Sequence, residues 1–395
     1  MSSMNTLTSV SSSNSLGVTK APKKVVIVLN TTWNLVNFRS GLIQALIDQG
    51  HEVIAVAPPD EYVPMLLSLG CRYVPVAMDT QGTRPGRDLL LLWRLIRLMR
   101  SERPNVFLGY TVKPNVYGSI AAHMLRIPVI NNIAGLGAVF IKDGLLVRVV
   151  RWLYRSALRR SAKVFFQNDD DRQLFISGGL VREEVTDLLP GSGIDLNRFK
   201  PWLKNIGHED RSKFRFLLIA RMLRDKGVVE YVEAARLLRQ RWPLAEFCLL
   251  GFLDVQNPTA ISHIEMDAWV AEGIVNYLGV SDDVRTHLVR ADCVVLPSYR
   301  EGTPRTLLEA AAMARPIITT DAVGCREVVD DGVNGYLCKV RDAEDLSAKM
   351  ELMLSLSPEQ RSEMGQQGRA KMVAMFDEQI VIGKYLAAIE EILAA

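Results

Sequence analysis

The sequence predicts an α/β protein of two doubly wound domains, each built on a parallel sheet. Short apolar runs rich in Val and Ile alternate with segments that have helical spacing. Runs such as Lys24–Asn30 are apolar almost throughout, which is typical of strands buried on both faces. The alternation restarts after the turn-forming segment Pro190–Asp195, and 395 residues are enough for two separate cores.

The first half carries six predicted strands separated by helices. The strands are short β-branched or aromatic runs, at residues 24–30, 53–57, 73–76, 105–109, 128–131 and 163–167. The helices end at glycine or basic residues, and they cover residues 41–49, 61–69, 87–103, 116–126 and 145–160. Between the first strand and the first helix we predict a polar loop, Thr31–Arg39.

The second half repeats the pattern. Its predicted strands cover residues 214–220, 247–250, 275–278, 293–296, 316–319 and 335–337, and its last helices cover 343–355, 358–376 and 378–393. We therefore predict a disordered tail at 1–22 and a first domain at 23–190. A second domain follows at 191–377, and a C-terminal helix at 378–395 packs back on the first domain.

Composition excludes several classes of protein. With 48% hydrophobic and 23% charged residues, the chain is typical of folded soluble proteins. A net charge of +3 gives little support for nucleic-acid binding. The five cysteines are scattered without C-x-x-C spacing, which argues against a disulfide framework or structural zinc and favours a reducing compartment. No apolar run approaches the roughly 20 residues that span a bilayer.

Two glutamates eight positions apart mark the most informative stretch. Glu301 lies in a Gly-Pro turn after the apolar strand Cys293–Pro297, and Glu309 lies inside the following helix. Ligands bind at the carboxyl ends of parallel strands, where helix starts favour anions. Carboxylates can accept hydrogen bonds from sugar hydroxyls. The combination indicates a nucleotide-sugar site.

Two cations follow the first strand of the second half. Arg221 and Lys226 leave a strand end and enter a helix start, an arrangement suited to a diphosphate. The same pattern also fits a solvated loop with surface charges. Because the first and fourth crossovers of such a sheet open onto one crevice, these cations and the two glutamates would converge on one ligand.

These motifs resemble the retaining glycosyltransferases of family four. The resemblance covers about residues 24–394 and rests on Arg221-x4-Lys226-Gly, Gly251, Tyr277–Gly279, Pro297–Glu309 and Gly324–Val328. It implies the GT-B fold, in which two Rossmann-like domains face each other across a cleft. Residues 112–118, 134–140, 193–199 and 251–258 are similar to the polyprenyl-diphosphate-linked-sugar N-acetylhexosaminyltransferases of bacterial glycan assembly.

The resemblance implies a role for each motif residue. Arg221 and Lys226 would hold the donor diphosphate, Glu301 would contact the transferred sugar, and Glu309 would accept from the ribose hydroxyls. Arg221, Lys226 and Glu301 are therefore the predicted catalytic residues. The remaining predicted donor-binding residues are Gly251 and, through backbone N–H groups, Gly302 and Thr303.

The same resemblance implies no metal and no cofactor, because fixed cations replace the metal. The acidic run Asp169–Asp171 fits a helix cap better than a metal site. None of the five histidines fits a base. The leaving phosphate can take the acceptor's proton instead.

The acceptor would lie against the first domain. Lys113, and less directly Arg39, could bind an acceptor diphosphate, and the Gly135–Gly137 turn permits close approach of a substrate. Two basic amphipathic helices, each with a tryptophan, fit a membrane interface with anionic lipid. They equally fit ordinary sheet-covering helices whose arginines face water. The predicted membrane contacts are Trp93, Arg94, Arg97, Arg148, Arg151, Trp152 and Arg155.

The function implied is transfer of an N-acetylhexosamine or hexose from a UDP-sugar to a polyprenyl-diphosphate-linked saccharide, as in polysaccharide or glycoprotein biosynthesis. Such an enzyme would be peripheral on the cytoplasmic face of the inner membrane. Two alternatives remain open at this point. The same fold could act on a soluble acceptor, or the chain could be a non-catalytic, nucleotide-sugar-binding subunit of a glycan assembly complex.

Overall fold

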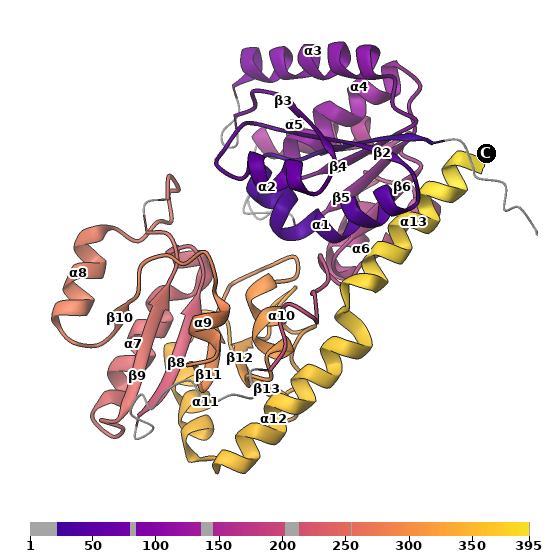
Figure 1. The fold of residues 1–395 in the computed structure, drawn as a ribbon. Helices are drawn as coiled ribbons and strands as arrows, with labels where there is room; N and C mark the ends of the chain where they lie inside the picture. The colour runs from indigo at the N-terminus through magenta and orange to yellow at the C-terminus, as the bar shows by residue number, and fades with distance from the viewer. Residues whose placement is uncertain (1–21, 80–83, 136–144, 202–212, 254, 395) are drawn as a thin grey trace, which may run out of the picture.

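The computed structural model confirms the predicted fold class, with two parallel sheets and helices on both faces of each (Figure 1). It describes residues 22–79, 84–135, 145–201, 213–253 and 255–394. No helix in these described ranges is both long enough and apolar enough to cross a membrane.

The first sheet has seven parallel strands. In spatial order they are β3 (Arg72–Pro75), β2 (Glu52–Ala57), β1 (Lys24–Val28), β4 (Val106–Tyr110), β5 (Val129–Ile133), β6 (Lys163–Phe166) and β7 (Thr186–Leu188). The second has six, in the order β10 (Asn276–Tyr277), β9 (Ala245–Leu250), β8 (Phe214–Ile219), β11 (Cys293–Leu296), β12 (Ile317–Thr320) and β13 (Gly335–Cys338). The strand β7 was not predicted, because its sequence, Thr-Asp-Leu, lacks an apolar run.

Helices connect the strands throughout. The first half contains α1 (Thr32–Asp48), α2 (Val63–Ser68), α3 (Pro85–Glu102), η1 (Pro114–Gly118), α4 (Ser119–Met124), α5 (Leu145–Leu158), α6 (Asp169–Ser177) and η3 (Glu183–Val185). The second contains η4 (Arg224–Lys226), α7 (Val228–Arg239), α8 (His263–Ala271), α9 (Arg285–Leu288), α10 (Arg305–Ala312), α11 (Ala343–Ser355), α12 (Pro358–Lys371), η5 (Met372–Phe376) and α13 (Glu378–Ala394).

The helix α1 starts nine residues earlier than predicted, so the predicted polar loop at Thr31–Arg39 is wrong. The side chain of Thr31 accepts from Asn34 N at 3.1 Å and caps the helix. Asp60, from the loop after β2, accepts from Thr32 N at 2.9 Å and from Trp33 N at 3.3 Å. These bonds satisfy backbone donors that an N-terminus otherwise leaves free. The partner lies 28 residues away, so local sequence did not reveal it.

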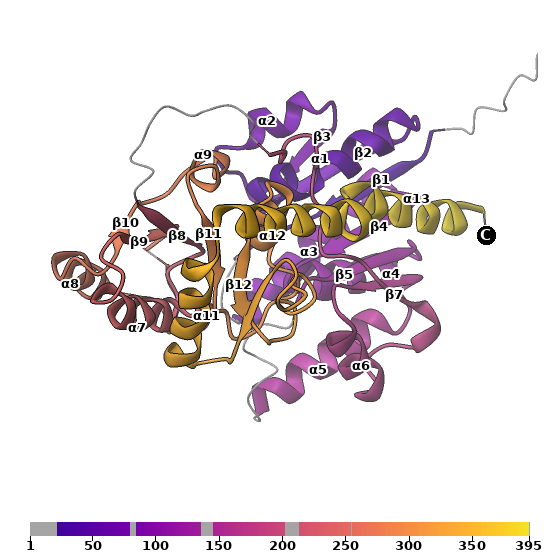
Figure 2. The same cartoon turned by 90° about the horizontal axis from the view of Figure 1, so that it is seen from below.

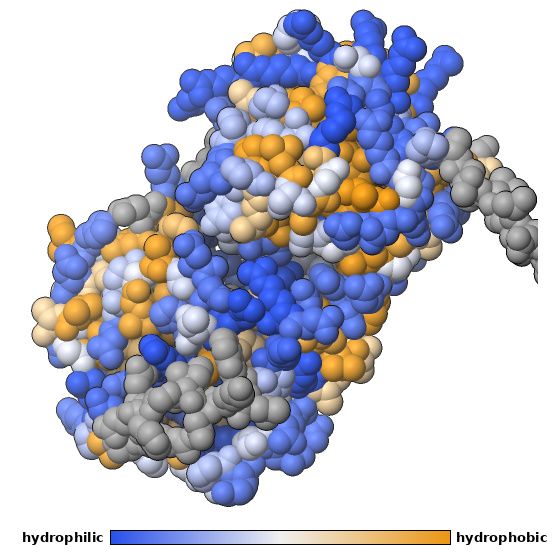
Figure 3. Space-filling model, viewed as in Figure 1, coloured by the Kyte–Doolittle hydropathy of each residue, from blue (hydrophilic) through white to orange (hydrophobic). Residues whose placement is uncertain are grey.

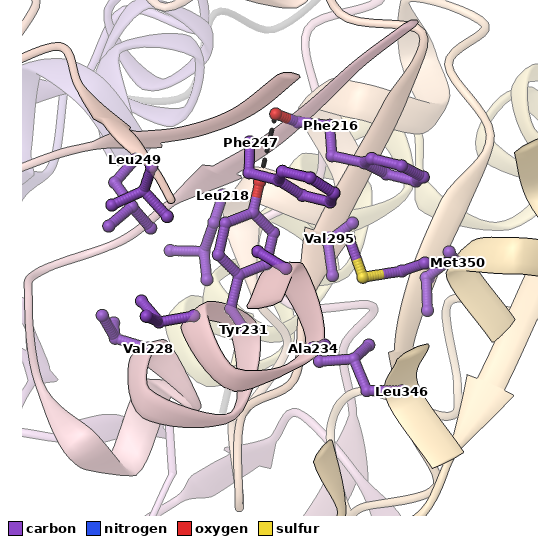
Figure 4. Packing of buried hydrophobic residues seen from close by; sticks show 14 of the residues in the cluster. Phe216, Leu218, Val228, Tyr231, Ala234, Phe247, Leu249, Val295, Leu346 and Met350 are labelled. Carbon is purple, nitrogen blue, oxygen red and sulfur yellow. Dashed lines mark hydrogen bonds between the residues drawn. The ribbon is translucent and has the colours of Figure 1, made fainter. Parts of the chain in front are cut away.

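Each sheet is buried on both faces. In the first half, α1 and α13 cover one face and α3, α4 and α5 cover the other. In the second half, α7 and α11 pack on one face, where Tyr231 lies among Phe216, Phe247 and Met350 (Figure 4). The hydroxyl of Tyr231 donates to Phe216 O at 3.1 Å, so this buried polar group has a hydrogen-bond partner within the apolar layer.

The chain crosses between the two halves twice, at residues 189–195 and 376–378. The two crossings are bonded to each other through Ile194 N to Phe376 O (2.8 Å) and Glu378 N to Ile194 O (3.1 Å). The helix α13 then runs along α1 on the first sheet (Figures 1 and 2). Its Tyr385 accepts from Asn132 Nδ2 at 2.8 Å and packs against Phe165. The C-terminal helix therefore belongs to the core of the first half.

This double crossing requires a glycine at position 193. Gly193 has φ +70°, and a Cβ there would overlap the backbone of Glu378. We expect Gly193→Ala to lower the free energy of unfolding by about 3 kcal/mol, because the left-handed backbone and the overlap act together.

Gly179→Ala is the matched control. Gly179 has φ +63° but no atom within 4 Å of a Cβ, so only the backbone cost of about 1 kcal/mol should remain. Urea titrations of both variants measure the difference. Equal losses of stability would contradict this account of the crossing.

Candidate active site

The carboxyl ends of the two sheets face each other, and the predicted site lies where they meet. Hydrophilic side chains gather between the two halves (Figure 3). From the first half, the loop after β5 reaches this boundary. From the second, the segment after β8 and the turn after β11 reach it. A Cβ on Gly135 would lie 3.2 Å from Gly302 N, so the two loops touch directly.

Glu301 and Lys226 form the centre of the site. Lys226 Nζ pairs with Glu301 Oε1, and Ser298 Oγ donates to the same oxygen at 2.7 Å. The side chains of the pair are 19% and 14% exposed, so both are largely screened yet still reachable. The structure thus brings together two of the three predicted catalytic residues, which lie 75 positions apart.

The loop that carries Lys226 depends on Gly227. This residue has φ +72°, and a Cβ there would overlap the carbonyl of Pro297 at the end of β11. Only glycine lets the start of α7 pass this close to the strand end. Arg221, five residues before Lys226, follows the end of β8 and is exposed. Within the described part of the chain it makes no ion pair.

Glu309 lies on α10 and is 13% exposed, much like Glu301. Its Oε1 accepts from Arg305 Nε at 3.2 Å, one helical turn earlier. Burial raises the pKa of Glu309, and the Arg305 guanidinium opposes this shift. Arg305 also donates to Ser192 Oγ at 3.1 Å and to Gly193 O at 3.0 Å, so it joins Glu309 to the crossing between the halves. The sequence analysis did not single out Arg305.

Gly251 has both backbone groups engaged. Its N–H donates to Gly279 O at 2.7 Å, and its carbonyl accepts from Tyr277 Oη at 2.8 Å. With φ +141° it lies against Ala220 O, where a Cβ would overlap. Gly251, just after β9, therefore allows close packing against Ala220, just after β8. Its role in donor binding stays a prediction.

The backbone at Gly302 and Thr303 lies against the first half of the molecule. A Cβ on Gly302 would overlap Ala134 O, and Thr303 Oγ1 donates to Gln167 O at 3.3 Å. Asn168 Nδ2 donates to Gly302 O at 3.3 Å. We predicted that this turn contacts the donor. The structure adds a contact between the halves that the sequence did not indicate.

The predicted acceptor residues are spread over two environments. Lys113, just after β4, has its Nζ 2.8 Å from Oδ1 of Asp88 on α3, and both side chains are nearly buried. The sequence analysis did not predict this pair. Arg39 is 6% exposed, with its guanidinium 4.3 Å from the Tyr110 ring centroid. This burial follows from the early start of α1, which places Arg39 within a helix. Gly137 lies outside the described residues.

The predicted membrane residues lie on α3 and α5, which cover the face of the first sheet opposite α1 and α13. Trp93 is 55% exposed and Trp152 is 65% exposed. The arginines of α5, at positions 148, 151 and 155, are exposed as well. On α3, Arg97 stacks 5.6 Å from the Trp93 ring centroid, whereas Arg94 donates to Ala77 O at 2.8 Å.

Two further features bear on the acidic residues. Within the ranges that the structure describes, no three His, Cys, Asp or Glu side chains gather as metal ligands would. Of the acidic run, Asp171 is buried and pairs with Arg300 from the second half. Asn168, just before the run, caps α6 by accepting from Asp171 N at 2.8 Å.

Two facing α/β domains, with a lysine, an arginine and two glutamates at their meeting edge, define the class: a two-domain glycosyltransferase. Comparison with known proteins agrees. Residues 37–191 match the glycosyl transferase 4-like domain, and residues 213–355 match glycosyl transferases group 1. Together the two domains take in more than half of the chain. The chain belongs to the family-four glycosyltransferases with the GT-B fold, which confirms the predicted resemblance.

Among curated relatives, the N,N'-diacetylbacillosaminyl-diphospho-undecaprenol alpha-1,3-N-acetylgalactosaminyltransferase of Campylobacter jejuni is 29% identical over 376 residues. That match covers 91% of this chain and 96% of the relative. An Escherichia coli UDP-Gal:alpha-D-GlcNAc-diphosphoundecaprenol alpha-1,3-galactosyltransferase is 24% identical, over 65% of this chain and 68% of that protein. The crystal structure of Anabaena HepE with UDP and glucose has the same fold. Its TM-score is 0.75 at 18% identity, covering 94% of this chain and all of that one.

Because the pKa of Glu309 is raised, the pH dependence of UDP binding tests its predicted role at the ribose. A buried carboxylate whose pKa lies above the ordinary value of 4.5 takes up its proton at a higher pH than exposed glutamates do. The neutral form accepts weaker hydrogen bonds from ribose hydroxyls. We therefore expect the affinity for UDP to fall on acidification while the pH is still above 4.5.

Isothermal titration of UDP, from neutral pH downward, measures this effect. Glu309→Gln is the control: it should bind UDP more weakly, by roughly tenfold, at neutral pH, and it should lack the Glu309 contribution to the pH dependence. The ionisation of UDP itself is common to both proteins. Identical pH profiles for parent and variant would refute the role of Glu309.

Proposed function

We propose that this glycosyltransferase is retaining and metal-independent, and that it moves a sugar from a UDP-sugar to a polyprenyl-diphosphate-linked saccharide. The observation that carries the proposal is the Lys226–Glu301 pair, held at the strand ends of the second sheet against the first half. The relative from C. jejuni, matched along nearly its full length, is named for a diphospho-undecaprenol acceptor. The transferred sugar is an N-acetylhexosamine or a hexose.

The donor would bind mainly to the second half. Its diphosphate lies between Arg221 and Lys226 at the start of α7, where the helix N-terminus adds further positive potential. Its ribose hydroxyls donate to Glu309. Fixed cations then carry the charge that develops on the leaving UDP, and no metal is required for that task.

Glu301 would accept from hydroxyls of the transferred sugar. In the unliganded site its charge is balanced by Lys226, and the incoming diphosphate shares that lysine. The bond between C1 of the sugar and the UDP oxygen breaks, and an acceptor hydroxyl attacks C1 from the same face. Its proton passes to the leaving phosphate oxygen. The configuration at C1 is retained, and catalysis depends on positioning and electrostatics.

A donor and acceptor panel tests this function. Purified protein is mixed with UDP-hexoses and UDP-N-acetylhexosamines, and with undecaprenyl-diphosphate-linked and water-soluble saccharides, and products are read by mass spectrometry. We expect transfer to the lipid-linked acceptor. For Glu301→Gln we expect kcat to fall by roughly a hundredfold or more with UDP still bound, because the contact acts on the transferred sugar.

Glu272→Gln is the matched control for that variant, because Glu272 pairs with Arg236 on the outside of the second half. It should keep parental turnover. Transfer to soluble saccharides alone would contradict the lipid-linked acceptor. Parental kcat in Glu301→Gln would contradict the site.

We further propose that the face of the first half that carries α3 and α5 binds anionic membrane. We propose separately that the enzyme works on the cytoplasmic face of the inner membrane. The support for the membrane contact is the set of exposed arginines on α5 around Trp152. Replacing Arg148, Arg151 and Arg155 with Gln should weaken binding to anionic vesicles on the order of a hundredfold.

The control for this surface is Arg182→Gln, an exposed cation outside α5 that pairs with Glu184. Co-sedimentation with phosphatidylglycerol vesicles, repeated at rising salt, gives the measurement. Vesicle binding that is unaffected by the three substitutions, or by salt, would remove α5 from the membrane contact.

A further inference from the structure

The turn that carries Glu301 is held from both halves of the molecule. On the side of the second half, Lys226 and Ser298 hold the Glu301 carboxylate. On the side of the first half, Gln167 and Asn168 bond the two residues that follow it. Immediately before it, Arg300 forms an ion pair with Asp171 of α6. The catalytic turn is therefore fastened to the opposite half on both sides of Glu301.

Asp171 is well placed for such a contact. Its side chain is fully buried, at 0% exposure. Its Oδ2 accepts from Asn168 Nδ2 at 3.2 Å, within the first half, and its Oδ1 faces Arg300. Burial raises the pKa of Asp171, and the Arg300 guanidinium lowers it. A buried carboxylate left without its cation is costly, so Asp171 favours the arrangement in which the halves are together.

A second contact on the same helix turn is weaker. Arg326 Nη2 lies 3.7 Å from Asp170 Oδ2, and both side chains are exposed to solvent. Exposed pairs of this kind contribute little. The Arg300–Asp171 pair, with its fully buried carboxylate, is thus the stronger of these two ion pairs.

We propose that Arg300 and Asp171 are positioning residues for sugar transfer. Their pairing fixes the Glu301 turn against the first half, so that Glu301 meets the transferred sugar only when the two halves are together. The inference rests on the proposed function, because it assumes that Glu301 contacts that sugar. Donor binding through Arg221, Lys226 and Glu309 does not need the pair, whereas turnover does.

Two variants, Asp171→Asn and Arg300→Leu, separate these steps. We expect kcat to fall by roughly tenfold to a hundredfold, because a displaced contact is felt most in the transition state. The Kd for UDP should stay at the parental value. Arg300→Lys, which keeps the charge, should recover part of the lost turnover. Asp169→Asn is the control, because Asp169 pairs with Arg172 on the same half and is exposed.

A double variant gives the sharpest readout. If Arg300 acts through Glu301, adding Arg300→Leu to Glu301→Gln costs no further turnover. If the kcat losses of the two single variants multiply in the double variant, the positioning role is overturned. Parental kcat in Asp171→Asn and Arg300→Leu would overturn it as well. A fall in UDP affinity as large as the fall in kcat would also overturn it, since that marks a pair that only supports the fold. Parental kcat in Glu301→Gln alone would instead overturn the proposed function.

Discussion

The close approach of two loops, one from each half, is the constraint on which the rest of the structure depends. Gly135, after β5, and Gly302, after β11, lie against each other, and a side chain at Gly302 would overlap Ala134 O. Glu301 is the immediate neighbour of this contact. Any larger residue at the contact would part the halves at the position where the transferred sugar must meet its acceptor. The glycine of the Glu-Gly-Thr turn is thus a packing requirement between domains as well as a turn residue.

Charge is balanced pairwise around this contact. Lys226 balances Glu301, Arg305 balances Glu309, and Arg300 balances Asp171. The first two pairs belong to the second half, where the donor is expected, and the third spans both halves. Arg221, which makes no ion pair within the described residues, adds one positive charge beyond the Lys226–Glu301 pair. That charge lies where the donor diphosphate is proposed to bind.

Arg305 extends this network to the crossing between the halves. It contacts Glu309 on one side and the backbone of Gly193 on the other, and its guanidinium lies 5.3 Å from the Phe38 ring of α1. Arg305 thus links Glu309, the residue proposed to bind the ribose, to the crossing between the halves. The C-terminal helix, bonded to the same crossing through Glu378, fixes where the second half returns to the first.

Local sequence was sufficient for much of this. The alternation of apolar runs predicted both sheets, and motif spacing brought Lys226 and Glu301 to one crevice. It missed partners that lie far apart in the chain. Asp60 accepts from the first backbone N–H groups of α1, so the helix starts early and includes the buried Arg39. Asp88 forms an ion pair with Lys113, and Asp171 forms one with Arg300. Arg39 and Lys113 were predicted to bind the acceptor because their surroundings in the fold cannot be inferred from local sequence. The run at Asp169–Asp171 was taken only as a helix cap for that reason.

A crystal structure of the protein with bound UDP tests the central claim most directly. The account predicts the diphosphate within hydrogen-bonding distance of Lys226 and Arg221, and the ribose on Glu309. It also predicts the two halves together at Gly135 and Gly302. A nucleotide bound at the strand ends of the first sheet, or away from both cations, would contradict it.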